Sequence, residues 1–190
     1  MDWLTYSFAD FVPITEAVYQ RLPLRVNQHW WPGPPFAWLL TLIALILRIK
    51  GDATKTANLV VGALWGWLGY GFFWVFYQPL IWAGGWFAMA CWLQLGLLWL
   101  LGFAPVPSSL HPWRWWSGSM LCALGIGWPL IGLLETDRPA QWPGFHPDPT
   151  AVFCLGWILL VSSGWTTWLL SLVPLLWCTW SLMMAANFYF

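Results

Sequence analysis

Six apolar runs, separated by short polar connections, constrain the fold of this chain more than any other feature of its sequence. A helix needs about 20 apolar residues to cross the hydrocarbon core of a bilayer. Within that core, only helices and closed barrels satisfy their own backbone hydrogen bonds. We therefore predict an all-α, polytopic transmembrane helix bundle of about six spans. The expected spans are residues 36–49, 56–77, 82–103, 115–134, 149–161 and 166–188.

The composition agrees with a membrane protein and argues against nucleic-acid binding. Hydrophobic residues make up 60% of the chain and charged residues 7%. Seven basic and seven acidic residues give a formal net charge of zero, so no basic surface is available for nucleic acid. The short connections leave no room for a soluble domain. We expect one integral membrane domain over residues 1–190, with an interfacial segment at 1–32 and the helix bundle at 33–190.

A short amphipathic helix is expected before the first span, over residues 13–24. Thr15 is placed to cap this helix and Pro23 to stop it. A helix with one apolar face lies at the membrane surface rather than across it. Its apolar residues recur at every fourth position: Ile14, Val18 and Leu22.

The segment before the fifth span is polar and stiffened by proline. Asp148 is placed to act as an N-cap, where its carboxylate would accept from free backbone N–H groups and face the positive end of the helix dipole. Pro149 would then take the first helical position, and Thr150 the next. His146 could stack, bond the cap, or bind a ligand at the membrane surface. The segment is thus either a helix start or a contact for a ligand or partner.

Tryptophan is unusually abundant, with 21 residues, and several lie nearer the middle of a span than its ends. Interfacial anchoring explains tryptophans at span ends, whereas a buried indole N–H needs a partner. The mid-span indoles either bond to neighbouring helices or line a site for a flat hydrophobic ligand. The residues that could line such a site are Trp65, Trp67, Trp92, Gln94 and Trp177.

Small residues recur along one face of the second span and again in the fourth. Such spacing lets helices approach closely, either within one chain or between chains. The residues of this predicted packing or partner surface are Gly62, Gly66, Gly69 and Gly118.

Signatures of transport and catalysis are missing from the sequence. Ion pumps need ionisable groups inside the membrane, and none falls securely at mid-span here. No spacing of histidine or cysteine matches a metal site, and no nucleophile motif occurs. We therefore predict no catalytic residue, no metal and a non-catalytic protein. An enzyme that uses His29 and His146 is a third, weaker hypothesis.

The cations divide between alternate connections. Arg48, Lys50, Lys55 and Arg114 lie on one side of the predicted bundle, and Arg21, Arg25 and Arg138 on the other. The positive-inside rule places the richer side in the cytoplasm, and both termini outside it.

Several motifs resemble those of one bacterial membrane family, domain of unknown function 6064. They occur at residues 10–19, 25–28, 65–70, 128–132 and 147–153, so the resemblance covers nearly the whole chain. It implies a bundle of about six helices in the bacterial cytoplasmic (inner) membrane. It implies no activity, and no functional residue can be carried over.

Two hypotheses of function follow. The leading one is an accessory or assembly subunit that packs against a larger respiratory or photosynthetic membrane complex, with membrane lipids and other subunits as its partners. The alternative is a carrier or sensor of a small hydrophobic ligand, such as a tetrapyrrole, a carotenoid or a lipid-like molecule, held at the mid-span tryptophans. A bound pigment or lipid is the cofactor class that this alternative implies.

Overall fold

The computed structural model describes residues 15–51, 54–101, 111–134 and 139–189, and this part of the chain is helical, without a strand. The helices follow one another in chain order. They are α1 (Glu16–Trp30), α2 (Gly33–Lys50), α3 (Thr54–Leu68), which continues as the π-helix η3 (Gly69–Tyr77), α4 (Gly84–Leu101), α5 (Pro112–Leu134), α6 (Pro147–Val161) and α7 (Trp165–Tyr189).

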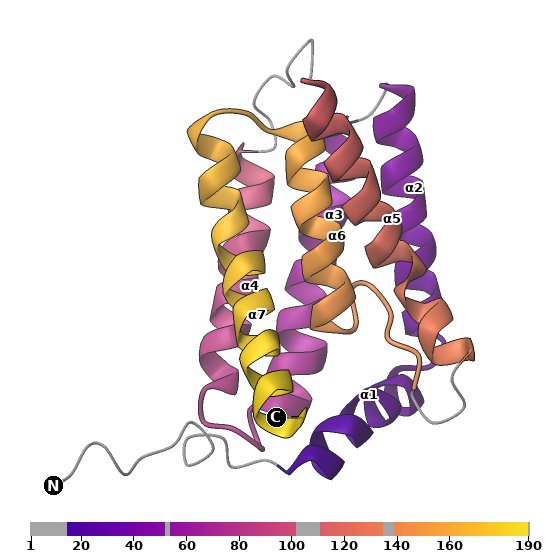
Figure 1. Cartoon of the computed structure of the whole chain (residues 1–190), viewed down its shortest axis with the longest axis vertical. Helices are drawn as coiled ribbons and strands as arrows, with labels where there is room; N and C mark the ends of the chain where they lie inside the picture. Colours follow the sequence, from indigo (N-terminus) through magenta and orange to yellow (C-terminus); the bar gives the residue numbers. More distant parts are fainter. Residues whose placement is uncertain (1–14, 52–53, 102–110, 135–138, 190) are drawn as a thin grey trace, which may run out of the picture.

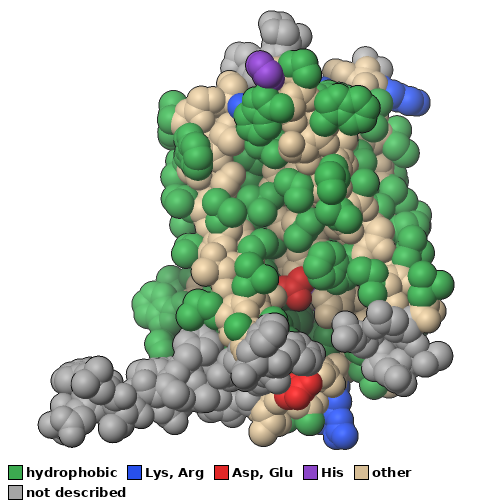
Figure 2. Space-filling view, viewed as in Figure 1, with side chains coloured by type: hydrophobic (Ala, Val, Ile, Leu, Met, Phe, Trp, Pro, Cys, Tyr) green, Lys and Arg blue, Asp and Glu red, His purple; other side chains and the backbone are tan. Residues whose placement is uncertain are grey.

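Helices α2 to α7 stand side by side, and α1 lies across one end of them (Figure 1). Five of the bundle helices, with α3 and η3 taken as one, are long and apolar enough to cross a membrane. The space-filling view shows a face that is mainly hydrophobic, with most charged side chains toward its two ends (Figure 2). The prediction of an all-α polytopic membrane protein with a short N-terminal helix outside the bundle is confirmed.

The shortest bundle helix, α6, is also the most buried. Its 15 residues span about 22 Å, less than the hydrocarbon thickness of about 30 Å. Eleven of those residues are buried, whereas the longer helices expose many large apolar side chains. Neighbouring helices, rather than lipid, therefore surround most of α6. Its length does not have to match the bilayer.

Two predicted helix ends are wrong. The N-terminal helix does not stop at Pro23 but continues to Trp30, with Leu22, Pro23 and Val26 buried. The packing of this buried face offsets the loss of the backbone hydrogen bond that Pro23 cannot donate. At the other position, α6 begins at Pro147, so its N-cap is His146 rather than Asp148. Prolines are tolerated in the first turn because its N–H groups have no partner within the helix.

The predicted glycine surface is used inside the chain. A Cβ atom at Gly62 would lie 2.5 Å from the Trp99 side chain of α4, and one at Gly66 would lie 3.1 Å from Leu95 of α4. A Cβ at Gly69 would meet the α4 backbone at 3.1 Å. These three glycines therefore let α3 and η3 pack closely against α4. They do not form a free surface for a partner.

Gly118 serves the same purpose between α5 and α6. A Cβ atom at Gly118 would lie 3.0 Å from the carbonyl oxygen of Gly156, and one at Gly156 only 2.5 Å from the carbonyl oxygen of Gly118. Backbone thus meets backbone at this point, and neither position has room for a side chain. The contact places α6 firmly against α5.

Candidate functional site

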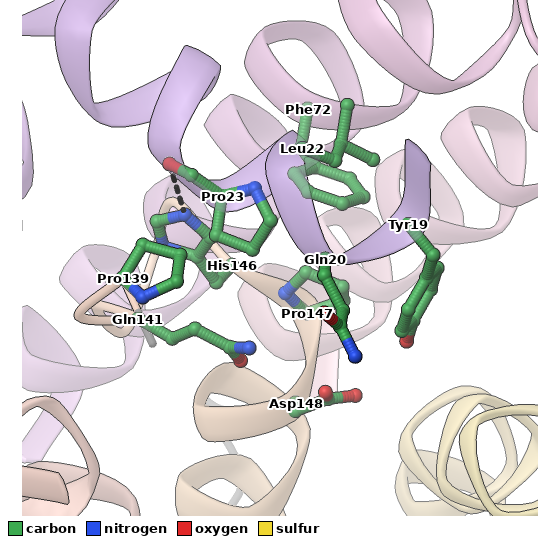
Figure 3. A pocket seen from close by; sticks show the side chains of 10 residues that line it. All are labelled: Tyr19, Gln20, Leu22, Pro23, Phe72, Pro139, Gln141, His146, Pro147 and Asp148. Carbon is green, nitrogen blue, oxygen red and sulfur yellow. Dashed lines mark hydrogen bonds between the residues drawn. The ribbon is translucent and has the colours of Figure 1, made fainter. Parts of the chain in front are cut away.

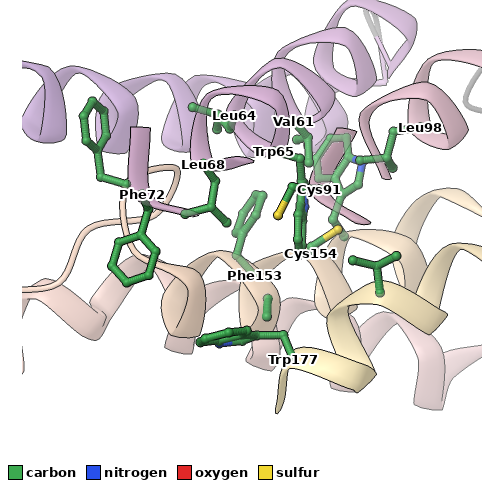
Figure 4. Close-up of a cluster of buried hydrophobic side chains, with 14 of the residues drawn as sticks. Val61, Leu64, Trp65, Leu68, Phe72, Cys91, Leu98, Phe153, Cys154 and Trp177 are labelled. Atoms are coloured by element: carbon green, nitrogen blue, oxygen red, sulfur yellow. The ribbon is translucent and has the colours of Figure 1, made fainter. Parts of the chain in front are cut away.

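A groove of about 370 Å³ opens between α4 and α7, near the end of the bundle that α1 crosses. Its walls are apolar and strongly aromatic. Residues of α3, η3, α4 and α7 line it: Trp65, Phe73, Trp86, Phe87, Ala90, Cys91, Val173, Leu176, Trp177, Thr179, Trp180 and Met183. Trp65 forms part of its buried wall, close to Cys91 and Cys154 (Figure 4). The groove lies within the hydrophobic length of the bundle.

The aromatic rings of the groove hold one another in place. Trp177 packs edge to face against Phe73 and Phe87, with ring centroids 5.0 and 5.3 Å apart. The indole N–H of Trp180 donates to the Tyr77 hydroxyl over 3.1 Å. Each edge-to-face ring pair stabilises the folded protein by about 1 kcal/mol, in addition to the effect of burying apolar area. The wall is therefore a connected set of rings rather than isolated side chains.

Trp177 connects this groove to a second, polar cavity. Its Nε1–H donates to Oδ1 of Asp148 over 2.7 Å. The ring of Trp177 lines the groove, while Asp148 lines the other cavity. One hydrogen bond therefore joins the two hollow regions of the molecule.

The polar cavity has a volume of about 140 Å³ and lies between α1 and the N-terminal end of α6 (Figure 3). Its lining residues are Tyr19, Gln20, Leu22, Pro23, Phe72, Pro139, Gln141, His146, Pro147 and Asp148. Figure 3 shows the side chains of Gln20 and Gln141 approaching Asp148 from two sides. No lysine or arginine is among the described lining residues. The cavity is therefore small and of mixed lining, with apolar and aromatic side chains, two glutamines, His146 and one carboxylate.

His146 fixes the entry into α6 to α1. Its Nδ1 accepts the backbone N–H of Trp142 over 2.9 Å, so we assign the ring proton to Nε2. Nε2 lies 3.4 Å from the carbonyl oxygen of Pro23, which it faces as a donor. Burial lowers the pKa of His146 to about 4, because the charged ring would lose its hydration. His146 is thus a neutral link between two elements.

Thr150 closes the same turn from within α6. Its hydroxyl donates to the carbonyl oxygen of His146 over 2.6 Å and accepts the backbone N–H of Gly144 over 2.7 Å. Gly144 has a positive φ of 82°, which favours glycine at this position. The backbone around His146 is therefore held by side chains from both sides.

The opposite end of α6 is closed by two arginines from its neighbours. Arg48 of α2 donates from Nη2 to the carbonyl oxygen of Leu160 over 2.7 Å. Arg114 of α5 donates to the carbonyl oxygens of Leu159 and Ser162. The last carbonyls of a helix have no partner within it and carry its negative dipole end, so guanidinium donors suit them. In the sequence, these arginines indicate only the charge balance of the connections, and nothing in the local pattern points to this role.

The predicted ligand-lining residues lie in three places, and only one of these is the groove. Trp65 and Trp177 line one groove, and Gln94 lies fully buried nearby, donating to the carbonyl oxygen of Leu170 over 2.9 Å. Trp67 instead packs against Trp30 at the α1 end, with ring centroids 4.9 Å apart. Trp92 lies on the outer surface of α4 and donates to the carbonyl oxygen of Gly66 over 3.2 Å.

The polar loop residues lie together, and Asp148 has a different role from the one expected. The structure places His146, Asp148 and Thr150 at the start of α6, and Pro149 is buried in its first turn. Asp148 accepts the indole N–H of Trp177 across the bundle instead of capping its own helix. A bond between residues 29 positions apart has no signal in the local pattern. The abundance of mid-span tryptophan, each needing an acceptor, was the available hint.

The two histidines of the enzyme hypothesis have different surroundings. His29 is exposed and packs against Trp30 and Phe76, whereas His146 is buried among backbone groups. Within the described residues, no group of three or more His, Cys, Asp or Glu side chains is arranged to hold a metal ion.

Comparisons with known proteins give a family but no activity. A family model described as a family of unknown function, DUF6064, matches residues 18–190, which is most of the chain. No curated protein and no solved structure matches the chain.

Proposed function

Because this chain belongs to the DUF6064 family, whose function is unknown, we propose a function from its own geometry. The protein is a non-catalytic membrane protein that holds a small, flat, hydrophobic molecule in the groove between α4 and α7. It acts as a carrier or a sensor of that molecule. The observation that carries this proposal is the aromatic groove of about 370 Å³ within the hydrophobic length of the bundle.

The size and lining of the groove support a ligand of limited size. Pockets for small molecules commonly measure about 300 to 1,000 Å³ and are lined mainly by apolar and aromatic side chains. The volume of this groove, about 370 Å³, lies near the lower end of that range. A single ring system therefore fits it better than a whole carotenoid or tetrapyrrole. Aromatic walls bind flat apolar rings through edge and face contacts. Trp65, Phe73 and Trp177 supply those contacts.

The rigidity of the groove wall supports its role as a ligand-binding site. The Trp177 side chain is held by its bond to Asp148 and by its ring neighbours, and Trp180 by its bond to Tyr77. A preformed wall loses little conformational freedom when a ligand enters. The groove can therefore accept a ligand without rebuilding the helices around it.

The accessory-subunit hypothesis stays a prediction, and so does its location in the bacterial inner membrane. Its proposed contact surface included Gly62 and Gly66, which pack against α4 of the same chain. A partner would have to use other surfaces. Among the described residues, the ligand hypothesis has a specific feature in its favour, and we therefore place it first.

The test compares the natural protein with a variant whose groove is filled. Ala90 lines the groove, so Ala90→Phe should occupy it, whereas Leu93→Phe adds a ring to an exposed position of the same helix that does not line the groove. Each protein is purified from its native membrane in mild detergent, and its bound small molecules are extracted and identified by mass spectrometry. We expect one flat hydrophobic molecule per chain in the natural protein and in Leu93→Phe.

Ala90→Phe should lose that molecule while keeping its helical circular dichroism. Equal amounts in all three proteins, or only bulk phospholipid, would contradict the ligand hypothesis. A large assembly that co-purifies in stoichiometric amounts, with no bound molecule, would favour the accessory subunit instead.

A further inference from the structure

We propose that the polar cavity beneath α1 binds a primary amine in its ammonium form, with the carboxylate of Asp148 as its acceptor. The cavity lies outside the aromatic groove, so this site does not require the groove to be occupied. The amine is either a free small molecule or the head of an amphiphile whose tail enters the groove. The second source rests on the proposed function.

The carboxylate has acceptor positions to spare. Trp177 donates to Oδ1, and Ser181 of α7 supplies a second hydrogen bond. A carboxylate offers about four acceptor positions, so two neutral donors do not saturate it. The described lining of the cavity contains no Lys or Arg, and both of these donors are neutral. A carboxylate withdrawn from water is stabilised most by a cation with N–H donors.

The rest of the lining also fits an ammonium group. The rings of Tyr19 and Phe72 line the cavity, and aromatic faces attract cations. Gln141 lines the same cavity as Asp148, and its amide oxygen can accept an N–H (Figure 3). An anion would meet the carboxylate with no basic residue in the described lining to offset it. These groups favour a cation over an anion or a neutral ligand.

The volume limits which cation can enter. About 140 Å³ accommodates a primary ammonium with a short chain, but not a long chain as well. A longer chain would need another space, and the groove lies across the Asp148–Trp177 hydrogen bond. Chain length therefore distinguishes the two sources of the amine.

The experiment titrates the full-length protein in mild detergent at neutral pH with methylammonium and hexylammonium chloride, and with 1-hexanol as the neutral counterpart of the longer amine. The readouts are the unfolding temperature and the tryptophan emission, to which Trp177 contributes. We expect a saturable shift with the amines and none with the alcohol. The absence of a saturable amine effect would overturn the proposal.

Two carboxylates provide a matched pair of variants. Asp148→Asn keeps the shape and an acceptor for Trp177 but removes the charge, and should weaken amine binding at least tenfold. Glu16→Gln changes a carboxylate on α1 that does not line the cavity; its amide oxygen can still accept the hydrogen bond of Gln20, so amine binding should stay unchanged. Equal affinities in the natural protein and in Asp148→Asn would overturn the proposal.

A third variant keeps the test decisive if Asp148→Asn fails to fold. Gln141→Lys retains the carboxylate and adds an ammonium group of the protein itself to the lining of the cavity. It should raise the unfolding temperature and remove the response to methylammonium. A folded Gln141→Lys protein that binds methylammonium as well as the natural protein would overturn the proposal.

The Ala90→Phe variant separates this inference from the proposed function. If hexylammonium binds at least tenfold more tightly than methylammonium, and Ala90→Phe removes that difference, the amine is the head of the groove ligand. Equal affinities for the two amines assign the cavity to a free small amine, and both results support amine recognition. A groove ligand found by mass spectrometry without any amine effect would overturn the inference alone. An amine effect without a groove ligand would overturn the proposed function alone.

Discussion

The two ends of α6 are both polar, yet they are built differently. At the C-terminal end, guanidinium groups of Arg48 and Arg114 donate to the last carbonyls of the helix, which have no donor within it. At the N-terminal end, the side chains of His146 and Thr150 form hydrogen bonds with the backbone. The carboxylate of Asp148 instead lines a cavity.

The difference separates a structural end from a candidate binding end. Donors that match the last carbonyls of a helix complete its hydrogen bonding and leave nothing for a ligand. An acceptor with unused capacity beside a cavity can still form a contact. Charge alone therefore does not identify the site, since both ends carry charged side chains.

The largest effect should come from opening the closed end. Replacing both Arg48 and Arg114 by Ala leaves buried carbonyls of α6 without donors, and should lower the free energy of unfolding by about 4 kcal/mol. Thermal unfolding in detergent, followed by circular dichroism, measures this loss. Arg21→Ala, at an exposed position of α1, is the matched control and should change little. A double variant as stable as the natural protein would show that these bonds do not close the helix.

Acid should weaken the other end. The pKa of His146 is about 4 in the folded protein, below its ordinary value of 6.5, because burial disfavours the charged ring. As pH falls, the imidazole of His146 is protonated at a higher pH in the unfolded chain than in the folded protein. The free energy of unfolding should therefore fall as pH drops from about 6.5 to about 4, and then level off. The total contribution is about 3 kcal/mol. His146→Gln should remove this pH dependence, whereas replacing the exposed His29 by Gln should preserve it.

Removing the bond between the two hollow regions should have a smaller effect. Trp177→Phe keeps a ring in the groove but takes away the donor to Asp148, and should cost about 2 kcal/mol in the free energy of unfolding. Its cost should disappear in an Asp148→Leu background, because no charged acceptor would then be left without its donor. Chemical unfolding of the two single variants and the double variant measures this coupling. Additive costs would mean that the bond contributes nothing of its own.

The smallest effect should come from the turn before α6. Thr150→Val has nearly the same shape but removes the hydroxyl that bonds Gly144 and His146, and should cost about 1 kcal/mol. Thr150→Ser keeps the hydroxyl and should retain most of the stability. Unfolding temperatures of the two variants, compared in one detergent, test whether the hydroxyl or the methyl group matters.

Much of the fold follows from local patterns in the sequence. The predicted spans agree with the observed helices to within a few residues, because a run of apolar residues must form a helix in a bilayer. The errors fall at prolines. Pro23 lies inside α1 and does not end it, because the buried face of this helix packs against the bundle. Pro147 rather than Pro149 begins α6, since a proline in the first turn is compatible with more than one boundary.

The candidate site was only partly predictable, for a physical reason. The sequence by itself determined that the chain forms a membrane bundle, that its indoles need partners, and that the polar segment before α6 is unusual. Only the tertiary structure decided that Trp177 bonds Asp148, that the glycines of α3 face α4, and that two arginines close α6. Apolar periodicity specifies which residues enter a helix, but contacts between helices depend on their rotation and order in the bundle. In a membrane both faces of a helix are apolar, so the pattern does not encode that rotation.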